Sequence, residues 1–161
     1  MRQGIRRVLV GLMAAVLLIV IATPAAGGNE EDYKVGKTAK SSDLKFTVHG
    51  FTNPHPPPSE FATPQPGYHF VSVDVEVINR KSEQQVFSSL LLFHLLDGKN
   101  RQYDTSLIIS AALNPPSPDG QIPAKGSIRG LVGFEVPDSA KRLKFRAQGS
   151  ITADGAIWKL K

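Results

Sequence analysis

One short stretch of the sequence gathers residue types that could do chemistry. Residues 93–104, FHLLDGKNRQYD, contain a histidine, two aspartates, a tyrosine and two basic residues. Such a set could form a metal site or an acid–base centre. However, Asp97 and Gly98 lie between alternating apolar residues, and Asp-Gly is a strong signal for a tight turn between two strands. The stretch therefore predicts a β-hairpin, with Phe93 pointing into the core and Tyr103 packing on the return strand.

Histidines offer a second possible chemistry. The chain has four, none with H-x-H or H-x3-H spacing, but His49 and His69 could meet if the strands around the proline-rich segment were adjacent. Copper(I) prefers thiolate or thioether ligands, and the chain has no cysteine, while both methionines precede residue 14. Solvent-facing histidines are the favoured interpretation. A copper or zinc carrier that uses His49 and His69 is the alternative, and we expect no bound cofactor.

Two carboxylates offer a third possibility. Asp74 and Glu76 lie two residues apart on a predicted strand, so they would share one face, about 7 Å apart. A carboxylate pair can hydrolyse glycosides, but acids opposite a row of valines usually form the solvent face of a sheet. No G-x-S-x-G motif is present, and without cysteine a thiol enzyme is excluded. We expect no enzyme, with a hydrolase as the alternative.

The elements that would hold these residues are strands. Residues 44–52 and 71–78 alternate with a period of two, which is typical of strands with one buried face. We expect His49 and Phe51 on the solvent face of the first of these strands. Between them, residues 53–67 contain six prolines, which lack a backbone donor, so we expect a surface loop there.

Further alternating segments follow at 128–136 and 143–148, and a last short strand contains Trp158. The run LLLFHLL at residues 90–96 fits mostly a strand, with a short helical turn as the alternative. The pattern predicts an all-β protein, an antiparallel β-sandwich of about seven to eight strands in which two one-faced sheets bury each other. The basic residues of KRLKFRAQ, residues 141–148, fit the solvent face of one strand.

The beginning of the chain has the pattern of a targeting segment. Three arginines precede an apolar run and a small-residue exit, which predicts a signal peptide or an uncleaved N-terminal anchor at residues 1–28. A flexible leader at 29–34 and a folded domain at 35–161 would follow. Delivery outside the cytoplasmic membrane is expected in both cases. Without cysteine, lipoprotein attachment and disulfides are excluded.

Charge argues against nucleic acid as a partner. The formal net charge is +5, but residues 1–28 hold three of the 19 basic residues and no acid, so 16 basic residues face 14 acidic ones in the remainder. No dense basic block is present, whereas nucleic-acid binders carry one. We therefore expect no nucleic acid as a partner. Contact with the membrane is expected only through the N-terminal segment, if it is uncleaved. The sequence leaves the oligomeric state open.

Three segments together resemble a known family. They are GYHFVSVDVEVINR (67–80), FHLLDGKNRQY (93–103) and GQIPAKGSIRGLVGFEVP (120–137). They resemble the telokin-like, immunoglobulin-like domains of secreted bacterial proteins, of the mycobacterial immunoprotective extracellular protein type. The resemblance covers residues 34–161. The matching positions include Gly67, Val73, Val75, Asn79, Phe93, Asp97, Gly98, Tyr103, Gly126, Phe134 and Pro137. This chain departs from the pattern in its missing lipidation cysteine, its shorter Asp turn and its enlarged proline loop.

The resemblance implies an immunoglobulin-like β-sandwich outside the cell, and it supplies no catalytic residue. The sequence thus favours a non-enzymatic binding or structural module at the cell surface or in the extracellular space. Its partner would be a protein or another envelope component. Because binding residues concentrate on loops held by a rigid scaffold, we expect the contact region within residues 53–67. The contact candidates there are His55, Pro57, Glu60, Phe61 and Gln65.

Overall fold

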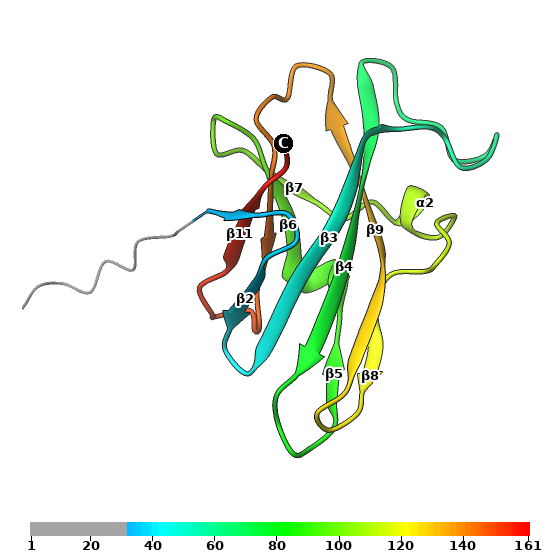
Figure 1. The fold of residues 1–161 in the computed structure, drawn as a ribbon. Coiled ribbons are helices and arrows are strands. Elements are labelled where there is room, and N and C mark those ends of the chain that lie inside the picture. The colour runs from blue at the N-terminus through cyan, green and yellow to red at the C-terminus, as the bar shows by residue number, and fades with distance from the viewer. Residues whose placement is uncertain (1–31) are drawn as a thin grey trace, which may run out of the picture.

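A computed structural model describes residues 32–161 of the chain (Figure 1). The predicted signal or anchor at 1–28 lies outside the described residues, as do residues 29–31 of the predicted leader. The elements, in chain order, are β1 (Tyr33–Lys34), β2 (Thr38–Ser41), β3 (Leu44–His55), β4 (Tyr68–Asn79), β5 (Gln85–Phe87), α1 (Ser89–Leu92), β6 (Phe93–Leu96), β7 (Gln102–Asp104), α2 (Leu107–Ser110), β8 (Gly120–Ile122), β9 (Ser127–Pro137), β10 (Lys144–Ala147) and β11 (Ala156–Lys159).

Two sheets face each other to form a β-sandwich of the immunoglobulin-like class, as predicted (Figure 1). One sheet has the strand order β2-β3-β4-β9 and the other β1-β11-β10-β6-β7, while β5 and β8 form a separate two-stranded ribbon. Every pairing is antiparallel except that of β1 with β11. No helix among residues 32–161 has the length and apolar character to cross a membrane.

The valine alternation in β4 sets the inner face of the first sheet. Val71, Val73, Val75 and Val77 are fully buried, whereas Ser72, Asp74 and Glu76 between them have the opposite orientation. Branched side chains suit the pleated surface of a strand, and β4 pairs with β3 on one side and β9 on the other. The alternation predicted from the sequence is confirmed.

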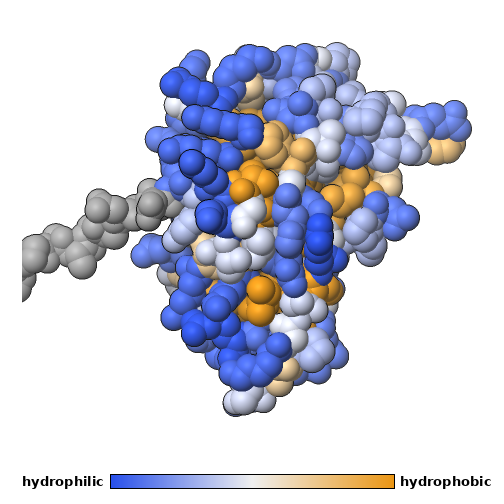
Figure 2. All heavy atoms as spheres, in the orientation of Figure 1, coloured by the Kyte–Doolittle hydropathy of each residue, from blue (hydrophilic) through white to orange (hydrophobic). Residues whose placement is uncertain are grey.

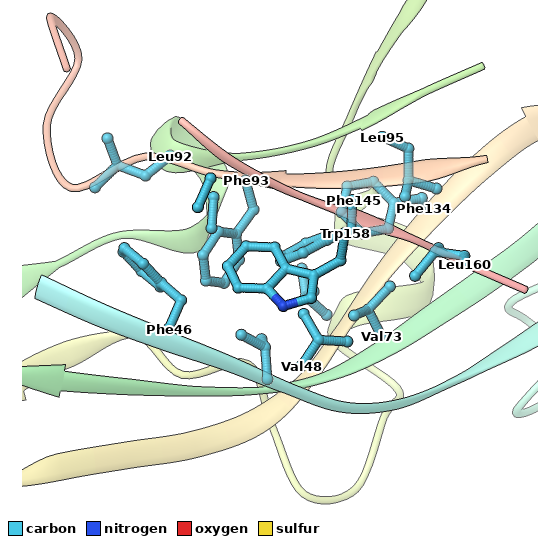
Figure 3. Packing of buried hydrophobic residues seen from close by; sticks show 14 of the residues in the cluster. Phe46, Val48, Val73, Leu92, Phe93, Leu95, Phe134, Phe145, Trp158 and Leu160 are labelled. Carbon is cyan, nitrogen blue, oxygen red and sulfur yellow. The ribbon is translucent and has the colours of Figure 1, made fainter. Parts of the chain in front are cut away.

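Aromatic rings fill the space between the sheets (Figure 3). The ring of Phe93 lies 5.0 Å from that of Phe145, which lies 6.1 Å from the indole of Trp158 and 6.2 Å from Phe134. The indole Nε1 donates a hydrogen bond of 2.9 Å to the carbonyl of Lys37, so the one polar atom of Trp158 is satisfied. These contacts connect β6, β10 and β11 to the opposite sheet.

A β-bulge in β3 changes which residues face the core. Val48 is opposite Val75 and Gly50 is opposite Asp74, so His49 is an extra residue in the ladder. The parity of the strand therefore reverses, and Phe51 packs against the core rather than facing solvent. The sequence-based placement of Phe51 was wrong because a strict period of two does not allow for the inserted residue.

The folded part also begins earlier than the sequence indicated. Tyr33 and Lys34, assigned to a flexible leader, form β1, where Tyr33 is opposite Trp158 with ring centroids 5.6 Å apart. Asp32 pairs with both Lys144 (3.0 Å) and Lys159 (3.1 Å). Short strands of this kind raise the number of strand segments among residues 32–161 to eleven, above the predicted seven or eight.

The two helices are single turns. The run at 90–96 contains both predicted alternatives, because α1 ends at Leu92 and β6 starts at Phe93. Helix α2 covers the outer face of β9, where a Cβ on Gly133 would lie 2.5 Å from Ile109. Ile109 also packs on Phe70, whose ring is fully buried on this outer face. The missing side chain of Gly133 therefore leaves the room that Ile109 occupies.

Candidate functional site

The FHLLDGKNRQYD stretch folds as the predicted hairpin, and its acid belongs to the turn. Asp97 is only 1% exposed. Its carboxylate accepts hydrogen bonds from the backbone N–H groups of Lys99 (2.8 Å) and Arg101 (3.0 Å), from Arg101 Nε (2.7 Å) and from the Tyr103 hydroxyl (3.1 Å). Burial raises the pKa of Asp97, but the hydrogen bonds from Arg101, Lys99 and Tyr103 outweigh it and hold that pKa well below its usual range.

The other groups of this stretch point elsewhere. Phe93 is fully buried, whereas the ring of His94 is on the opposite face, where its Nδ1 lies 3.0 Å from Asp104. The strand alternation thus separates His94 from Asp97. The hairpin does not assemble an acid–base centre.

His49 and His69 do not meet. His69 has the same parity on β4 as Val71, so it lies on the inner face at the end of the sandwich, whereas His49 contacts Glu76 on the outer face. The register also separates them by five to six positions of β4, roughly 17–20 Å of strand. The alternative of a metal site shared by His49 and His69 is therefore not supported. Among residues 32–161, no three His, Cys, Asp or Glu side chains converge as a metal site would require.

Asp74 and Glu76 share the outer face of β4, as predicted, but each accepts hydrogen bonds from neighbouring side chains. Arg129 donates to Asp74 from Nε (2.8 Å) and from its terminal nitrogen (2.7 Å), which lowers the pKa of Asp74. Hydrogen bonds from Ser127 and then His49 lower the pKa of Glu76. A glycosidase needs one carboxyl with a raised pKa to protonate the leaving group. Neither residue meets that requirement, so the hydrolase alternative is not supported.

The proline-rich loop is shorter than predicted. Strand β3 continues to His55, which is opposite Phe70, and a register irregularity between Thr52 and His55 accommodates Pro54. His55 is thus a half-buried strand residue. The β3–β4 loop, defined here as residues 56–67, extends from the upper right of the sandwich in Figure 1.

The β3–β4 loop is attached at two places and exposed between them. Ala62 is buried, and the backbone N–H of Gln65 donates to the carboxylate of Glu135 on β9 at 2.6 Å. Pro57 and Glu60 are exposed, and the side chain of Phe61 is 88% exposed. Four of the five predicted contact residues therefore belong to this loop, and only His55 does not.

A cleft of about 460 Å³ lies at the base of this loop. One wall holds His69, whose Nδ1 lies 3.0 Å from Asp138 and whose Nε2 lies 2.9 Å from the side-chain oxygen of Asn53. The other wall holds Lys141 and Arg142, from the connection between β9 and β10. Both ring nitrogens of His69 are engaged by protein oxygens, so the ring is fixed in place and offers no free ligand atom.

Sequence reasoning missed most of this cleft. It assigned Lys141 and Arg142 to the solvent face of a strand, but β10 begins only at Lys144, so both belong to the preceding connection. The alternation of that segment starts at Leu143, which was the available signal that the two cations precede the strand. No local pattern indicates that Asp138 reaches His69, because 69 residues separate them in the chain.

The residues that carry the family resemblance occupy structural positions. Val73, Val75, Phe93 and Phe134 are fully buried in the core. Gly67 precedes β4 with φ +79°, and Pro137 ends β9 opposite Tyr68.

Polar members of the same set connect loops. Asn79 is 1% exposed, and its Nδ2 donates to the carbonyls of Glu83 (2.7 Å) and Pro123 (3.0 Å). The backbone N–H of Asn79 donates to the carbonyl of Gly126 at 2.9 Å. Gly98 belongs to the hairpin turn, where its N–H donates to the carbonyl of Lys141 at 2.8 Å.

These features define the class of protein: a β-sandwich domain with a protruding loop and a cleft at the base of that loop. Among residues 32–161, the side chains that were predicted as catalytic candidates do not assemble into a catalytic site. Within that class the chain belongs to the family described as a domain of unknown function, DUF4352, whose model matches residues 33–157. No curated protein is a significant match to the sequence.

Solved structures share the fold at low identity. The yjhA protein from Bacillus subtilis superposes with a TM-score of 0.57 at 14% identity, over 80% of this chain and 99% of that one. MPT63, a secreted protein from Mycobacterium tuberculosis, gives 0.52 at 12% identity, over 78% and 94%. A B. subtilis protein described as a candidate lipoprotein, ycdA, gives 0.54 at 19% identity, over 76% of this chain and 38% of that one.

Proposed function

We propose that this chain is an exported, non-enzymatic module of the telokin-like type. It binds a protein or another envelope component through the β3–β4 loop and works outside the cytoplasmic membrane. The basic and apolar pattern of residues 1–28 supports export. The fold shared with the secreted protein MPT63, together with the motifs at 67–80, 93–103 and 120–137, supports the type. With no cysteine among its 161 residues, the chain has no thiol for lipid attachment.

One observation carries the binding role: the 88% exposure of Phe61 on a loop whose flanks are fixed. Covering an exposed phenyl ring with a partner removes apolar surface from water and so stabilises the complex. Aromatic side chains dominate the energetics of protein interfaces. Buried Ala62 and the Gln65–Glu135 hydrogen bond restrain the backbone beside it. A partner would therefore pay little of the ordering cost that flexible loops impose on binding.

Capture from an envelope extract tests the loop. The wild-type protein is expected to retain a component that a Phe61→Ser variant and a variant lacking residues 57–64 lose. The matched control is Ile151→Ser, because Ile151 is 73% exposed and lies in the β10–β11 turn at the other end of the sandwich. Equal capture by the wild type and Phe61→Ser would falsify the assignment, as would equal loss in the Ile151→Ser control.

Export has a separate test. N-terminal sequencing of the protein from each cell fraction should find it outside the cytoplasm, either cut near residues 25–28 or intact and membrane-bound. A cytoplasmic protein with an intact N-terminus would contradict export and leave the loop assignment standing.

A further inference from the structure

Two connections that are far apart in the sequence meet at one end of the sandwich. They are the turn of the β6–β7 hairpin, at the upper left of Figure 1, and residues 138–143 between β9 and β10, at its top. The hydrogen bond from Gly98 N–H to the Lys141 carbonyl joins them. A Cβ on Gly98 would lie 2.7 Å from Arg142 Nε, so the glycine leaves the space that the guanidinium stem occupies. Arg142 itself has a left-handed backbone, with φ 55°.

Two neighbouring hollows at this meeting point share Lys141 and Arg142 in their linings. Lys141 and Arg142 line the 460 Å³ cleft together with His69, and they also line a neighbouring hollow of about 190 Å³ that includes Lys99. Leu143 and Leu160, which are 4% and 7% exposed, supply an apolar part of the cleft lining. The surrounding surface is mostly hydrophilic in Figure 2.

The carboxylates in the walls are already paired. Arg101 binds Asp97 at 2.7 Å, and His69 lies 3.0 Å from Asp138. Within residues 32–161, no carboxylate is within ion-pair distance of the cationic groups of Lys99, Lys141 or Arg142. Lys141 and Arg142 thus line the cleft without an acidic partner, and Lys99 is a third such cation in the neighbouring hollow. The mutual repulsion of these cations favours an anion beside them.

We propose that this cleft binds an oxyanion, a phosphate or carboxylate group on a small molecule. The guanidinium of Arg142 supplies the planar fork of donors that matches two oxygens of such a group, and Lys141 adds a charged donor beside it. Leu143 and Leu160 would contact the apolar part of the same ligand. The inference goes beyond the proposed function, because none of these residues belongs to the exposed β3–β4 loop.

Amide chemical shifts of the ¹⁵N-labelled exported protein measure this binding. Inorganic phosphate and citrate are titrated separately at constant ionic strength, with chloride as the reference anion. Gly98 and Leu143, which flank the cations, are expected to shift saturably with one or both probes. Whichever probe saturates at the lower concentration distinguishes a phosphate from a carboxylate ligand. The absence of saturable shifts below about 10 mM for both probes, a weaker limit than ordinary ligand affinities, overturns the proposal.

Charge variants decide whether the cations act as a site. A Lys141→Gln, Arg142→Gln double variant should weaken binding about tenfold or more, which is the scale of charged hydrogen bonds. The matched control is Lys40→Gln with Lys45→Gln, an exposed cross-strand pair of β2 and β3 with the same loss of charge. That control should weaken binding by about twofold or less. Equal weakening in both double variants would show attraction by net charge alone and overturn the proposal.

Gly98→Ala tests the geometry with every charge retained. Its added methyl group crowds the Arg142 side chain, so binding should weaken severalfold while shifts in the core stay unchanged. Wild-type affinity in this folded variant would overturn the assignment of Arg142. Phe61→Ser should bind the probe like the wild type, and the Lys141→Gln, Arg142→Gln variant should keep the loop partner, so failures of the two proposals are distinguishable.

Discussion

The hydroxyl of Tyr103 donates a hydrogen bond of 3.1 Å to the carboxylate of Asp97, six residues earlier on the other side of the β6–β7 turn. Asp97 is also bound by Arg101 and by two backbone N–H groups. One buried carboxylate thus holds the turn that contacts the β9–β10 connection. The hairpin turn and the cation cluster beside it are therefore expected to depend on the charge of Asp97.

Replacing Asp97 by Asn should destabilise the domain in a pH-dependent way. The folded-state pKa of Asp97 lies below its ordinary value of about 3.9. Its charge therefore contributes stability that is fully present above that value and is lost as pH falls toward the folded-state pKa. Urea unfolding from pH 7 to pH 2.5 should show a constant deficit for Asp97→Asn above about pH 5, which shrinks in acid. Exposed Asp43→Asn is the control, and a deficit that grew in acid would contradict the argument.

Gly130→Ala should be strongly destabilising. A Cβ at this position would overlap the backbone carbonyl of Pro116 in the loop that covers β9, and backbone cannot move aside as a flexible side chain can. Overpacking of this kind costs about 1–3 kcal/mol or more in free energy of unfolding. Gly50→Ala in β3 is the matched control, because nothing lies within 4 Å of its added Cβ. Equal stabilities of the two variants by denaturant titration would refute the close approach.

Asn79 gives a test of the polar connections in the core. Asn79→Ala removes the donor to Glu83 and Pro123 and should cost about 1–3 kcal/mol. Asn79→Asp places a carboxylate against the same carbonyl oxygens, which raises its pKa in the folded state. Its destabilisation should therefore grow as pH rises above about 4. Unfolding curves at several pH values, with exposed Asn100→Asp as the control, measure this, and a pH-independent cost would contradict it.

The aromatic core should respond most strongly at Phe93, whose ring contacts those of Phe87 and Phe145 at 5.1 and 5.0 Å. Phe93→Ala should lower the free energy of unfolding by about 3–5 kcal/mol. Leu91, two residues earlier in α1, is 57% exposed, and its replacement by Ala should change stability by about 0.5 kcal/mol or less. Thermal and denaturant unfolding of both variants provide the comparison, and similar costs would argue against the placement of Phe93.

Local patterns were sufficient for the parts of the fold that depend on neighbouring residues. The period of two at Val71–Val77 and the Asp97–Gly98 turn predicted β4 and the β6–β7 hairpin, because side-chain alternation and turn chemistry are properties of adjacent residues. The same alternation, counted back from Val71, places His69 on the inner face. The alternation could therefore have shown that His69 does not share the outer face of Glu76, the residue that His49 contacts.

Features that depend on distant contacts were not predictable in this way. The bulge at His49 is visible only in the pairing of β3 with β4, and it reversed the orientation of Phe51. Strand β1 consists of two residues and exists because β11, more than a hundred residues later, lies beside it. The cleft likewise depends on the approach of residues 138–143 to Asn53 and Gly98, which no local pattern encodes.

Strand β1 has one more consequence, which concerns self-association. It is the outermost strand of its sheet, and Tyr33 and Lys34 cover part of the backbone edge of β11. An uncovered edge can pair with another chain and start aggregation, and very short edge strands are one protection against this. A protein cut just after Lys34 would leave the edge that contains Trp158 open to a second molecule. The two residues first assigned to a leader therefore help to keep neighbouring copies from joining edge to edge.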